Sequence, residues 1–226
     1  MDNHEPNILA IDASSDRLKL AVMFAGDRLV KAESEEERSH GQVIIKRIAD
    51  LMQAAGIDKK RLDAIAITTG PGSFTGLRIG LAAAKGMAVA LGIPLIGISV
   101  YDAAAYKLAG YHEPVYVVVP LRRDEFFIGL IRDGRLVGEI STVGVGDLPG
   151  AIGENKVAAY GVSLTARLAG LKLADVSEQI RYDGGDLAQI ALGRFEAAQF
   201  EDLAALEPLY IKKSQAEIRF DERNHG

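Results

Sequence analysis

The segment Thr69-Gly-Pro-Gly-Ser-Phe-Thr-Gly-Leu-Arg-Ile-Gly80 separates a predicted buried strand, residues 62–68, from a predicted long helix, residues 75–91. The strand prediction rests on an apolar run, and the helix is expected to end at Gly92 and Pro94. A strand, a glycine-rich turn and a helix in this order are typical of α/β proteins. The segment therefore sets the fold class that the rest of the chain must match.

Small residues recur at a strict four-residue step along this helix, at Gly76, Gly80, Ala84 and Ala88. The step places them on one helical face. Glycine inside a helix costs about 1 kcal/mol relative to alanine, so we expect this face to allow close approach of another element. Two neighbours fit, the protein's own sheet or a helix of a partner chain. A second predicted helix, residues 42–55, has a broad apolar face that could join such a contact.

The order of the other elements in residues 1–110 indicates a particular architecture. Apolar runs predict strands at 8–11, 18–24, 28–33 and 95–98, a capping box at Ser39 and Gln42 opens the helix over 42–55, and a short helix follows at 101–108. This β-β-β-α-β-α-β-α order resembles half of the actin, sugar-kinase and Hsp70 ATPase architecture, although spacing alone also fits other α/β folds.

A composition shift near residues 110–114 marks a predicted second lobe. We expect strands at 115–120, 125–131, 135–143 and 157–160, a turn at Asp133-Gly134, a short helix opened by Ser163 or Thr165, and a helix at 186–195. These are fewer clear elements than in the first half. The expected organisation is an α/β actin-like (ribonuclease H-like) fold with a first lobe at 1–110, a reduced second lobe at 111–205, and a tail at 206–226 that returns to the first lobe.

Composition argues against several function classes. The net charge is -5, and the basic clusters at 59–61, 122–123 and 212–213 are short, so we do not expect direct, strong binding of nucleic acid by this chain alone. The chain has no cysteine, which removes disulfides, thiolate metal sites and cysteine nucleophiles. The polar N-terminus shows no signal peptide, and the apolar stretch 79–98 is interrupted by charge, glycine and proline. These features predict a cytoplasmic protein without a membrane span.

The glycine-rich segment does not fit the known phosphate or nucleophile motifs. A Walker A loop ends in Gly-Lys-Ser/Thr, whereas this loop has Gly76-Leu77-Arg78. A dinucleotide fingerprint requires a third glycine where Thr75 stands. The stretch Gly72-Ser-Phe-Thr-Gly76 also lacks the spacing of the Gly-x-Ser-x-Gly elbow. A nucleotide phosphate or hydrolase site at this loop is therefore not expected.

The same segment closely resembles the signature of the TsaB/YeaZ family. Three further stretches match that family in order and spacing, at residues 8–14, 93–100 and 207–212. The resemblance thus runs from the first strand to the tail. It implies a non-catalytic subunit that binds a TsaD-like enzyme and, with a TsaE-like ATPase, supports threonylcarbamoyl transfer to adenosine 37 of tRNA. The alternative is a weak actin-like ATPase or an M22-type metallopeptidase.

The resemblance also suggests how the chain would meet its partner. The two long helices would contact the TsaD-like subunit, and in isolation the same face could form a homodimer. The expected interface residues are Val43, Ile44, Arg47, Leu51, Gly76, Leu77, Gly80, Ala84 and Met87.

A metal or nucleotide site looks altered in this sequence. The metal-dependent TsaD relatives carry a His-x-x-x-His pair on the first helix, and here Ile44 takes the second position after His40. The actin-like Asp-x-Gly turn reads Asp12-Ala13-Ser14, and Pro120 stands where relatives commonly have aspartate in the second lobe. We expect no catalytic residue and no tightly bound cofactor, with ATP, ADP and metal belonging to the partner complex. Asp12, Ser14 and Ser15 are the candidates for residual cofactor contact, and Asp12 is also expected to cap its own turn.

Overall fold

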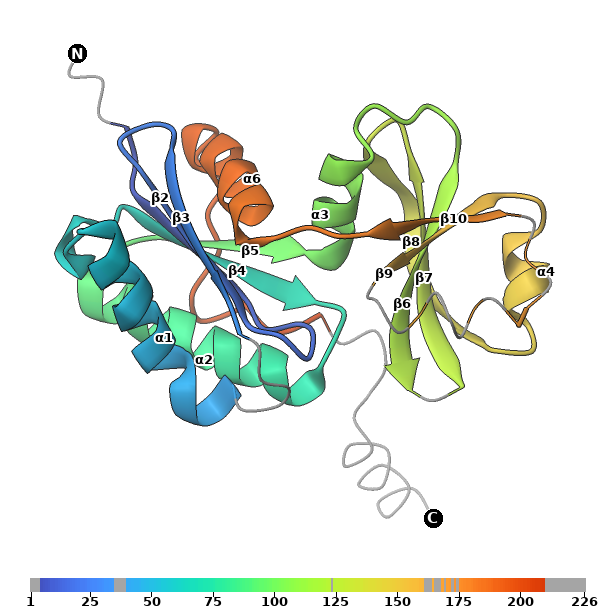
Figure 1. The fold of residues 1–226 in the computed structure, drawn as a ribbon, viewed down its shortest axis with the longest axis horizontal. Coiled ribbons are helices and arrows are strands. Elements are labelled where there is room, and N and C mark those ends of the chain that lie inside the picture. Colours follow the sequence, from blue (N-terminus) through green and yellow to red (C-terminus); the bar gives the residue numbers. More distant parts are fainter. Residues whose placement is uncertain are drawn as a thin grey trace.

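Two lobes, each built on one β-sheet, lie side by side in the computed structural model (Figure 1). The structure describes residues 5–34, 40–122, 124–160, 164, 168, 170, 171, 173 and 175–209. The predicted helix start at Ser163 or Thr165 and the capping box at Ser39 lie outside these residues. The side chains of His40 and Gln42 are likewise outside the described part.

The first sheet has the strand order β3-β2-β1-β4-β5. β2 pairs with β1 and β3 in antiparallel fashion, whereas β1, β4 and β5 run parallel. The strands are β1 Ile8–Asp12, β2 Lys19–Phe24, β3 Arg28–Glu33, β4 Ala64–Gly70 and β5 Leu95–Ser99. Together with the element order, this arrangement confirms the predicted actin-like topology of the first lobe.

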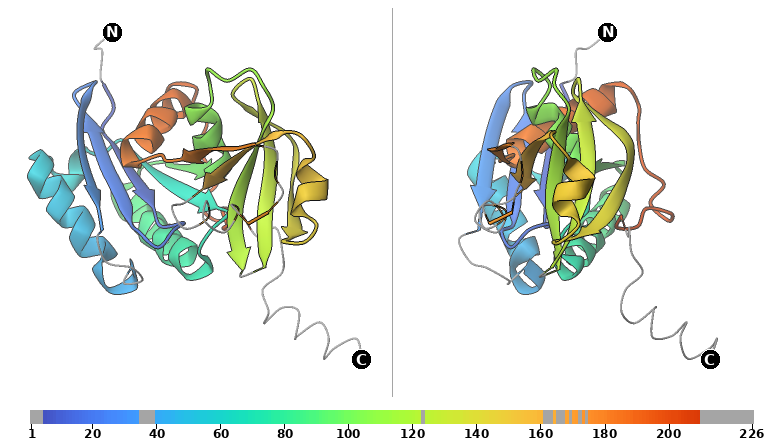
Figure 2. Two further views of the ribbon diagram at one scale, coloured as in Figure 1. Left: turned by 45° about the vertical axis from the view of Figure 1, so that its right-hand side comes forward. Right: turned by 90° about the vertical axis from the view of Figure 1, so that its right-hand side faces the viewer.

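Helices cover both faces of the first sheet. α1 (His40–Ala55) and α2 (Phe74–Leu91) lie against one face, and α3 (Val100–Lys107) and α6 (Gly184–Glu196) lie on the other (Figures 1 and 2). Strand residues alternate between the two cores: Leu9 and Ile11 face α1 and α2, whereas Ile8 and Ala10 face α3 and α6. α2 ends where predicted, because Gly92 adopts the left-handed conformation that favours glycine, with φ 67°.

The second sheet repeats the order of the first. Its order β10-β9-β6-β7-β8 again combines three antiparallel strands, β6 to β8, with two parallel ones, β9 and β10. The strands are β6 Val115–Arg122, β7 Glu125–Arg132, β8 Arg135–Gly144, β9 Lys156–Tyr160 and β10 Asp175–Ile180, and the short helix α4 spans Leu148–Ile152. The second lobe therefore keeps a complete five-stranded sheet, and the sequence pattern missed β10 and α4.

The chain returns to the first lobe directly after β10. α6 packs against β1 and β2, so residues 184–196 belong spatially to the first lobe, ahead of the expected boundary at 205. Gly184 makes this possible, because a Cβ there would lie 2.6 Å from the Leu20 carbonyl carbon. The following segment stays on the first lobe, where the Leu209 amide donates to the Thr69 carbonyl at 2.8 Å.

The small-residue face of α2 points inward. A Cβ on Gly76 would lie 2.1 Å from the Ala13 carbonyl oxygen, and one on Gly80 would lie 3.0 Å from the Ala13 Cβ. The neighbour that requires glycine is therefore the protein's own β1 turn. By length and composition alone α2 could cross a membrane, but the same features suit a core helix.

This packing corrects the expected partner interface. Six of its nine residues are buried inside the lobe, namely Ile44, Leu51, Gly76, Leu77, Gly80 and Ala84. They fill the core against the first sheet and cannot form an outward surface. Arg47 is exposed, and Val43 and Met87 are half-buried.

The inward and outward glycines of α2 provide a matched stability test. Gly76→Ala should lower the free energy of unfolding by about 1–3 kcal/mol, because the added methyl overpacks a backbone contact. Gly86→Ala meets nothing within 4 Å, so it should raise stability by up to about 1 kcal/mol through helix propensity. Urea unfolding followed by circular dichroism measures both. Equal effects of the two substitutions would contradict the inward packing of Gly76.

Candidate functional site

The glycine-rich segment holds the turn that follows β1. The Ser73 amide donates to the Ser14 carbonyl at 2.7 Å, and a Cβ on Gly72 would lie 2.2 Å from that same oxygen. Ser73 also caps α2, since its hydroxyl accepts the Gly76 amide at 3.2 Å. The amide of Ser73 and the N-terminus of α2 therefore serve this packing contact. The segment therefore acts as a packing element for the β1 turn.

Asp12 is a fully buried carboxylate at the carboxyl end of β1. Its Oδ1 accepts the Ser14 amide at 2.8 Å, which confirms that Asp12 caps its own turn. Its Oδ2 lies 3.2 Å from the Lys19 Nζ, and the Lys19 side chain is 14% exposed. A buried carboxylate requires such a counter-charge, because desolvation of an isolated charge is very costly. The two residues come from adjacent antiparallel strands, where Asp12 is the register partner of Lys19.

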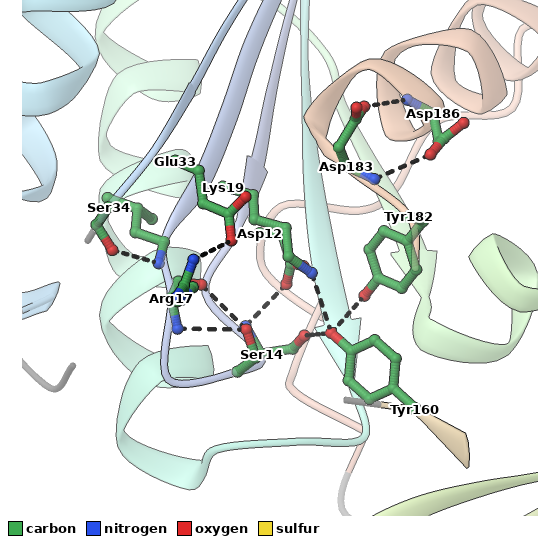
Figure 3. A network of polar contacts seen from close by, with 12 residues as sticks. Asp12, Ser14, Arg17, Lys19, Glu33, Ser34, Tyr160, Tyr182, Asp183 and Asp186 are labelled. Carbon is green, nitrogen blue, oxygen red and sulfur yellow. Dashed lines mark hydrogen bonds and ion pairs between the residues drawn. The ribbon is translucent and has the colours of Figure 1, made fainter. Parts of the chain in front are cut away.

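The second lobe completes this centre with two tyrosines. Tyr160, the last residue of β9, places its hydroxyl 3.2 Å from the Ser14 Oγ and 3.4 Å from the Lys19 Nζ. Tyr182, just after β10, lies 3.1 Å from Tyr160 between hydroxyl oxygens, and the two rings stack with centroids 5.4 Å apart. Figure 3 shows the tyrosines reaching the Asp12 turn from the side of the second lobe. We call Asp12, Ser14, Lys19, Tyr160 and Tyr182 the inter-lobe centre.

The electrostatics of the inter-lobe centre favour a single ion pair. Burial by itself would raise the pKa of the Asp12 carboxyl, but the Lys19 ammonium and the Ser14 hydrogen bonds outweigh it and lower that pKa. Burial opposes the charge on Lys19 too, yet Asp12 raises its pKa above the ordinary value. Burial raises the pKa of Tyr160 and Tyr182, so both remain neutral donors. The centre thus holds one negative and one positive charge.

The predicted cofactor residues separate in the structure. Asp12 and Ser14 belong to the inter-lobe centre, whereas the Ser15 hydroxyl donates to the Arg17 carbonyl in an exposed part of the loop. Sequence reasoning missed Lys19, Tyr160 and Tyr182. A lysine opening an otherwise apolar strand was the available signal for Lys19. The tyrosines meet Asp12 only through the pairing of the lobes, which no local pattern encodes.

A metal centre finds no support among the described residues. No group of three or more His, Cys, Asp or Glu side chains is gathered there in a geometry that could hold an ion. His112 is 87% exposed and pairs with Asp133 at the hairpin turn. Pro120 lies within β6, beside an irregularity in its pairing with β7. In chemical terms the inter-lobe centre can hold the lobes together, and its one carboxylate is already neutralised.

Comparisons with known proteins agree with this geometry. The family model described as TsaD, tRNA N6-adenosine threonylcarbamoyltransferase, matches residues 34–218. The tRNA threonylcarbamoyladenosine biosynthesis protein TsaB of Haemophilus influenzae is 30% identical over 129 residues, which cover 56% of this chain and 54% of that protein. TsaB of Escherichia coli is 38% identical over 93 residues, 41% of this chain and 39% of that protein. The matched segments thus span about half, or less, of these relatives.

A solved structure shows the same fold over nearly the whole chain. It comes from Pseudomonas aeruginosa, is described as an uncharacterized protein with similarity to peptidase YEAZ, and superposes with a TM-score of 0.76 at 24% identity. The superposition covers 92% of this chain and 100% of the other.

The strand orders and the inter-lobe centre define a two-lobed α/β protein of actin-like topology whose central carboxylate is neutralised by the chain's own lysine. These features agree with the matches to the family model and to the TsaB proteins, which together show the family of the chain. It belongs to the TsaB/YeaZ family.

Replacing the lysine should reverse the pH dependence of stability. In the wild type the pKa of the Asp12 carboxyl is lower in the folded protein than in the unfolded chain, where it is about 3.9. The stability that this difference contributes is present above about pH 3.9, and it is lost as the pH falls through the folded pKa. In Lys19→Met the carboxylate is buried without a counter-charge, which should cost about 3–5 kcal/mol near neutral pH. Burial then raises the folded pKa, so the variant should gain stability as the pH falls.

Urea midpoints measured from about pH 7 to about pH 5 test this reversal. The double variant Asp12→Asn/Lys19→Met is the control, and its midpoint should not show the gain. A Lys19→Met variant that instead loses stability on acidification in this range would contradict the ion pair.

Proposed function

We propose that this chain is a non-catalytic subunit for threonylcarbamoyladenosine synthesis on tRNA, which binds a TsaD-like transferase and acts with a TsaE-like ATPase. The names of its TsaB relatives support the pathway, and the match to the TsaD family model supports common ancestry with the transferase. In this proposal nucleotide and metal belong to the partners, the tRNA is contacted indirectly, and the complex works in the cytoplasm. The metallopeptidase alternative gains no support from the described residues.

The state of Asp12 is the observation that carries the non-catalytic part of the proposal. A carboxylate that holds a metal-bound nucleotide must be open to the ion. Asp12 is 0% exposed, and Lys19, Ser14 and the two tyrosines surround it. Placing a divalent ion and phosphates there would require Lys19 to leave and the lobes to separate. Support of a partner's active site therefore fits this chain better than phosphate chemistry of its own.

The outward side of α2 offers a surface for that partner. A second row at four-residue steps consists of Phe74, Arg78, Ala82, Gly86 and Ala90, all of which are exposed. This row is offset by two residues from the buried row that begins at Gly76, which puts it on the opposite side of the helix. The proposed contact is therefore the outward row, in place of the inward row expected from the sequence.

Two properties make this outward row suitable for packing against a helix. A Cβ on Gly86 would meet nothing within 4 Å, and Ala82 and Ala90 flank it one turn away on each side, so another helix can approach closely. Large apolar side chains lie nearby in solvent, since Val89 is 69% exposed and Ile45 of the adjacent α1 is 57% exposed.

An aromatic anchor stands at the start of the row. Phe74 is 41% exposed, and the Arg78 guanidinium lies 3.9 Å from its ring centroid. Aromatic and arginine side chains are enriched at the energetic centres of interfaces. In this proposal the row and its flanking residues form the contact with the TsaD-like subunit. In isolation the same surface supports a homodimer, because exposed apolar helical faces tend to self-associate.

Co-purification tests the proposed contact. Gly86→Leu places a bulky side chain in the row and should weaken capture by the cognate TsaD-like subunit at least about tenfold, the effect of about 1.4 kcal/mol. The matched control is Gly193→Leu, which adds the same side chain at an open helical position on α6. Both variants should unfold at nearly wild-type urea concentrations, because neither new side chain meets protein atoms at its Cβ.

A tRNA modification assay with purified partners tests the function itself. Threonylcarbamoyladenosine should form when wild-type chain or Gly193→Leu is added and should fall in proportion to lost capture with Gly86→Leu. Undiminished capture by Gly86→Leu would exclude the outward row as the contact. Modification that proceeds equally well without the chain would contradict the proposed role.

A further inference from the structure

The Lys19 ammonium is surrounded as a bound cation would be. Its Nζ lies 3.2 Å from the Asp12 Oδ2 and 3.4 Å from the Tyr160 hydroxyl. The same atom lies 4.4 Å from the ring centroid of Tyr182 and 5.4 Å from that of Tyr160. Carboxylate, hydroxyl and aromatic faces are all groups that attract a cation. They come from both lobes, so the ammonium sits at the junction between them (Figure 3).

On the strand beside β1, one buried hydroxyl lacks a hydrogen bond in the part of the chain that the structure describes. Thr68 is 1% exposed, and its Oγ1 is the buried side-chain polar atom that lacks a hydrogen bond within the described ranges. β1 and β4 run parallel with Ile11 paired to Ile67, so Thr68 follows as the neighbour of Asp12 at the strand ends. Because Ile11 and Ile67 belong to the α1–α2 core, strand alternation places the Asp12 and Thr68 side chains on the opposite face of the sheet. An unpaired buried hydroxyl normally costs stability, which makes it a spare oxygen ligand at this site.

The charge balance fixes the valence of the ion. Asp12 supplies one negative charge, and the tyrosines stay neutral because burial raises the pKa of each. One monovalent cation therefore balances the site. A divalent ion would leave an uncompensated positive charge in the interior, where such a charge is expensive.

We infer that the surroundings of the Lys19 ammonium, formed by Asp12, the rings of Tyr160 and Tyr182 and the neighbouring Thr68, are a monovalent-cation site. The ammonium is the resident ion in the wild type, and K⁺ or NH₄⁺ can take its place when the lysine side chain is removed. Oxygen ligands and aromatic faces suit these weakly hydrated ions better than Mg²⁺, which holds its water tightly. The cation stabilises the junction of the lobes, because it attracts polar groups from each lobe. This inference is independent of the contact proposed for α2.

Truncation of the lysine tests whether a free cation can take its place. Lys19→Ala removes the ammonium and its chain and leaves Asp12 in position. Thermal unfolding is followed in KCl, NH₄Cl or N-methyl-D-glucamine chloride at one ionic strength, the last supplying a bulky organic cation. K⁺ and NH₄⁺ should raise the midpoint of the variant by about 2–4 °C over the large cation.

Three matched proteins show whether the effect belongs to this site. The wild type should not distinguish the salts, because its own ammonium fills the space. Lys19→Met, which keeps the volume but not the charge, and the double variant Asp12→Asn/Lys19→Ala should not distinguish them either. A Lys19→Ala variant that folds only when K⁺ or NH₄⁺ is present would also support the site, with the folded fraction from circular dichroism as the readout.

Several results would overturn the inference. One is a Lys19→Ala variant with the same midpoint in all three salts, and another is a variant that fails to fold in every salt. Equal stabilisation of the Asp12→Asn double variant by K⁺ would place the ion elsewhere. A wild type that responds to K⁺ as strongly as the variant would show that Lys19 is not the resident ion.

Discussion

The buried ion pair between Asp12 and Lys19 is the constraint on which the end of β1 depends, at the place where the two lobes meet. It neutralises a carboxylate that is 0% exposed, and it places a positive charge beneath two tyrosines of the second lobe. Without this charge the end of β1 would hold a costly buried anion. With it, the end of β1, at the edge of the sheet where α/β proteins commonly bind ligands, is covered by the chain's own lysine and tyrosines. The fold is thus actin-like, and its centre is occupied by a buried ion pair.

The glycine-rich segment supports the same centre from the other side. Gly72 and Gly76 let the start of α2 touch the backbone of Ala13 and Ser14, and this contact holds the Asp12 turn in place. A segment that resembles a phosphate loop in composition therefore acts as a packing element. Its opposite helical row, which includes Gly86, remains open to solvent. One helix thus holds the turn on one side and exposes, on the other, the row that we propose as the partner surface.

Local patterns in the sequence predicted much of the first lobe, and they failed where the structure depends on distant contacts. The strand runs, the end of α2 at Gly92 and the capping role of Asp12 are local, and the structure agrees with them. The inward direction of Gly76 was one of two open alternatives, because helical spacing shows which residues share a face but not what covers it. β10 was missed because four of the six residues of Asp175–Ile180 are polar. Tyr160 and Tyr182 could not be assigned, since only the pairing of two sheets brings them to Asp12.

The most direct test of the central claim is a carboxyl-detected NMR titration of Asp12 in the folded wild-type protein. If Lys19 neutralises this carboxylate inside the junction, Asp12 should stay ionised as the pH falls and titrate below the ordinary aspartate value. An Asp12 signal that titrates at or above the ordinary value would mean that the carboxylate lacks its cation, and it would contradict the account.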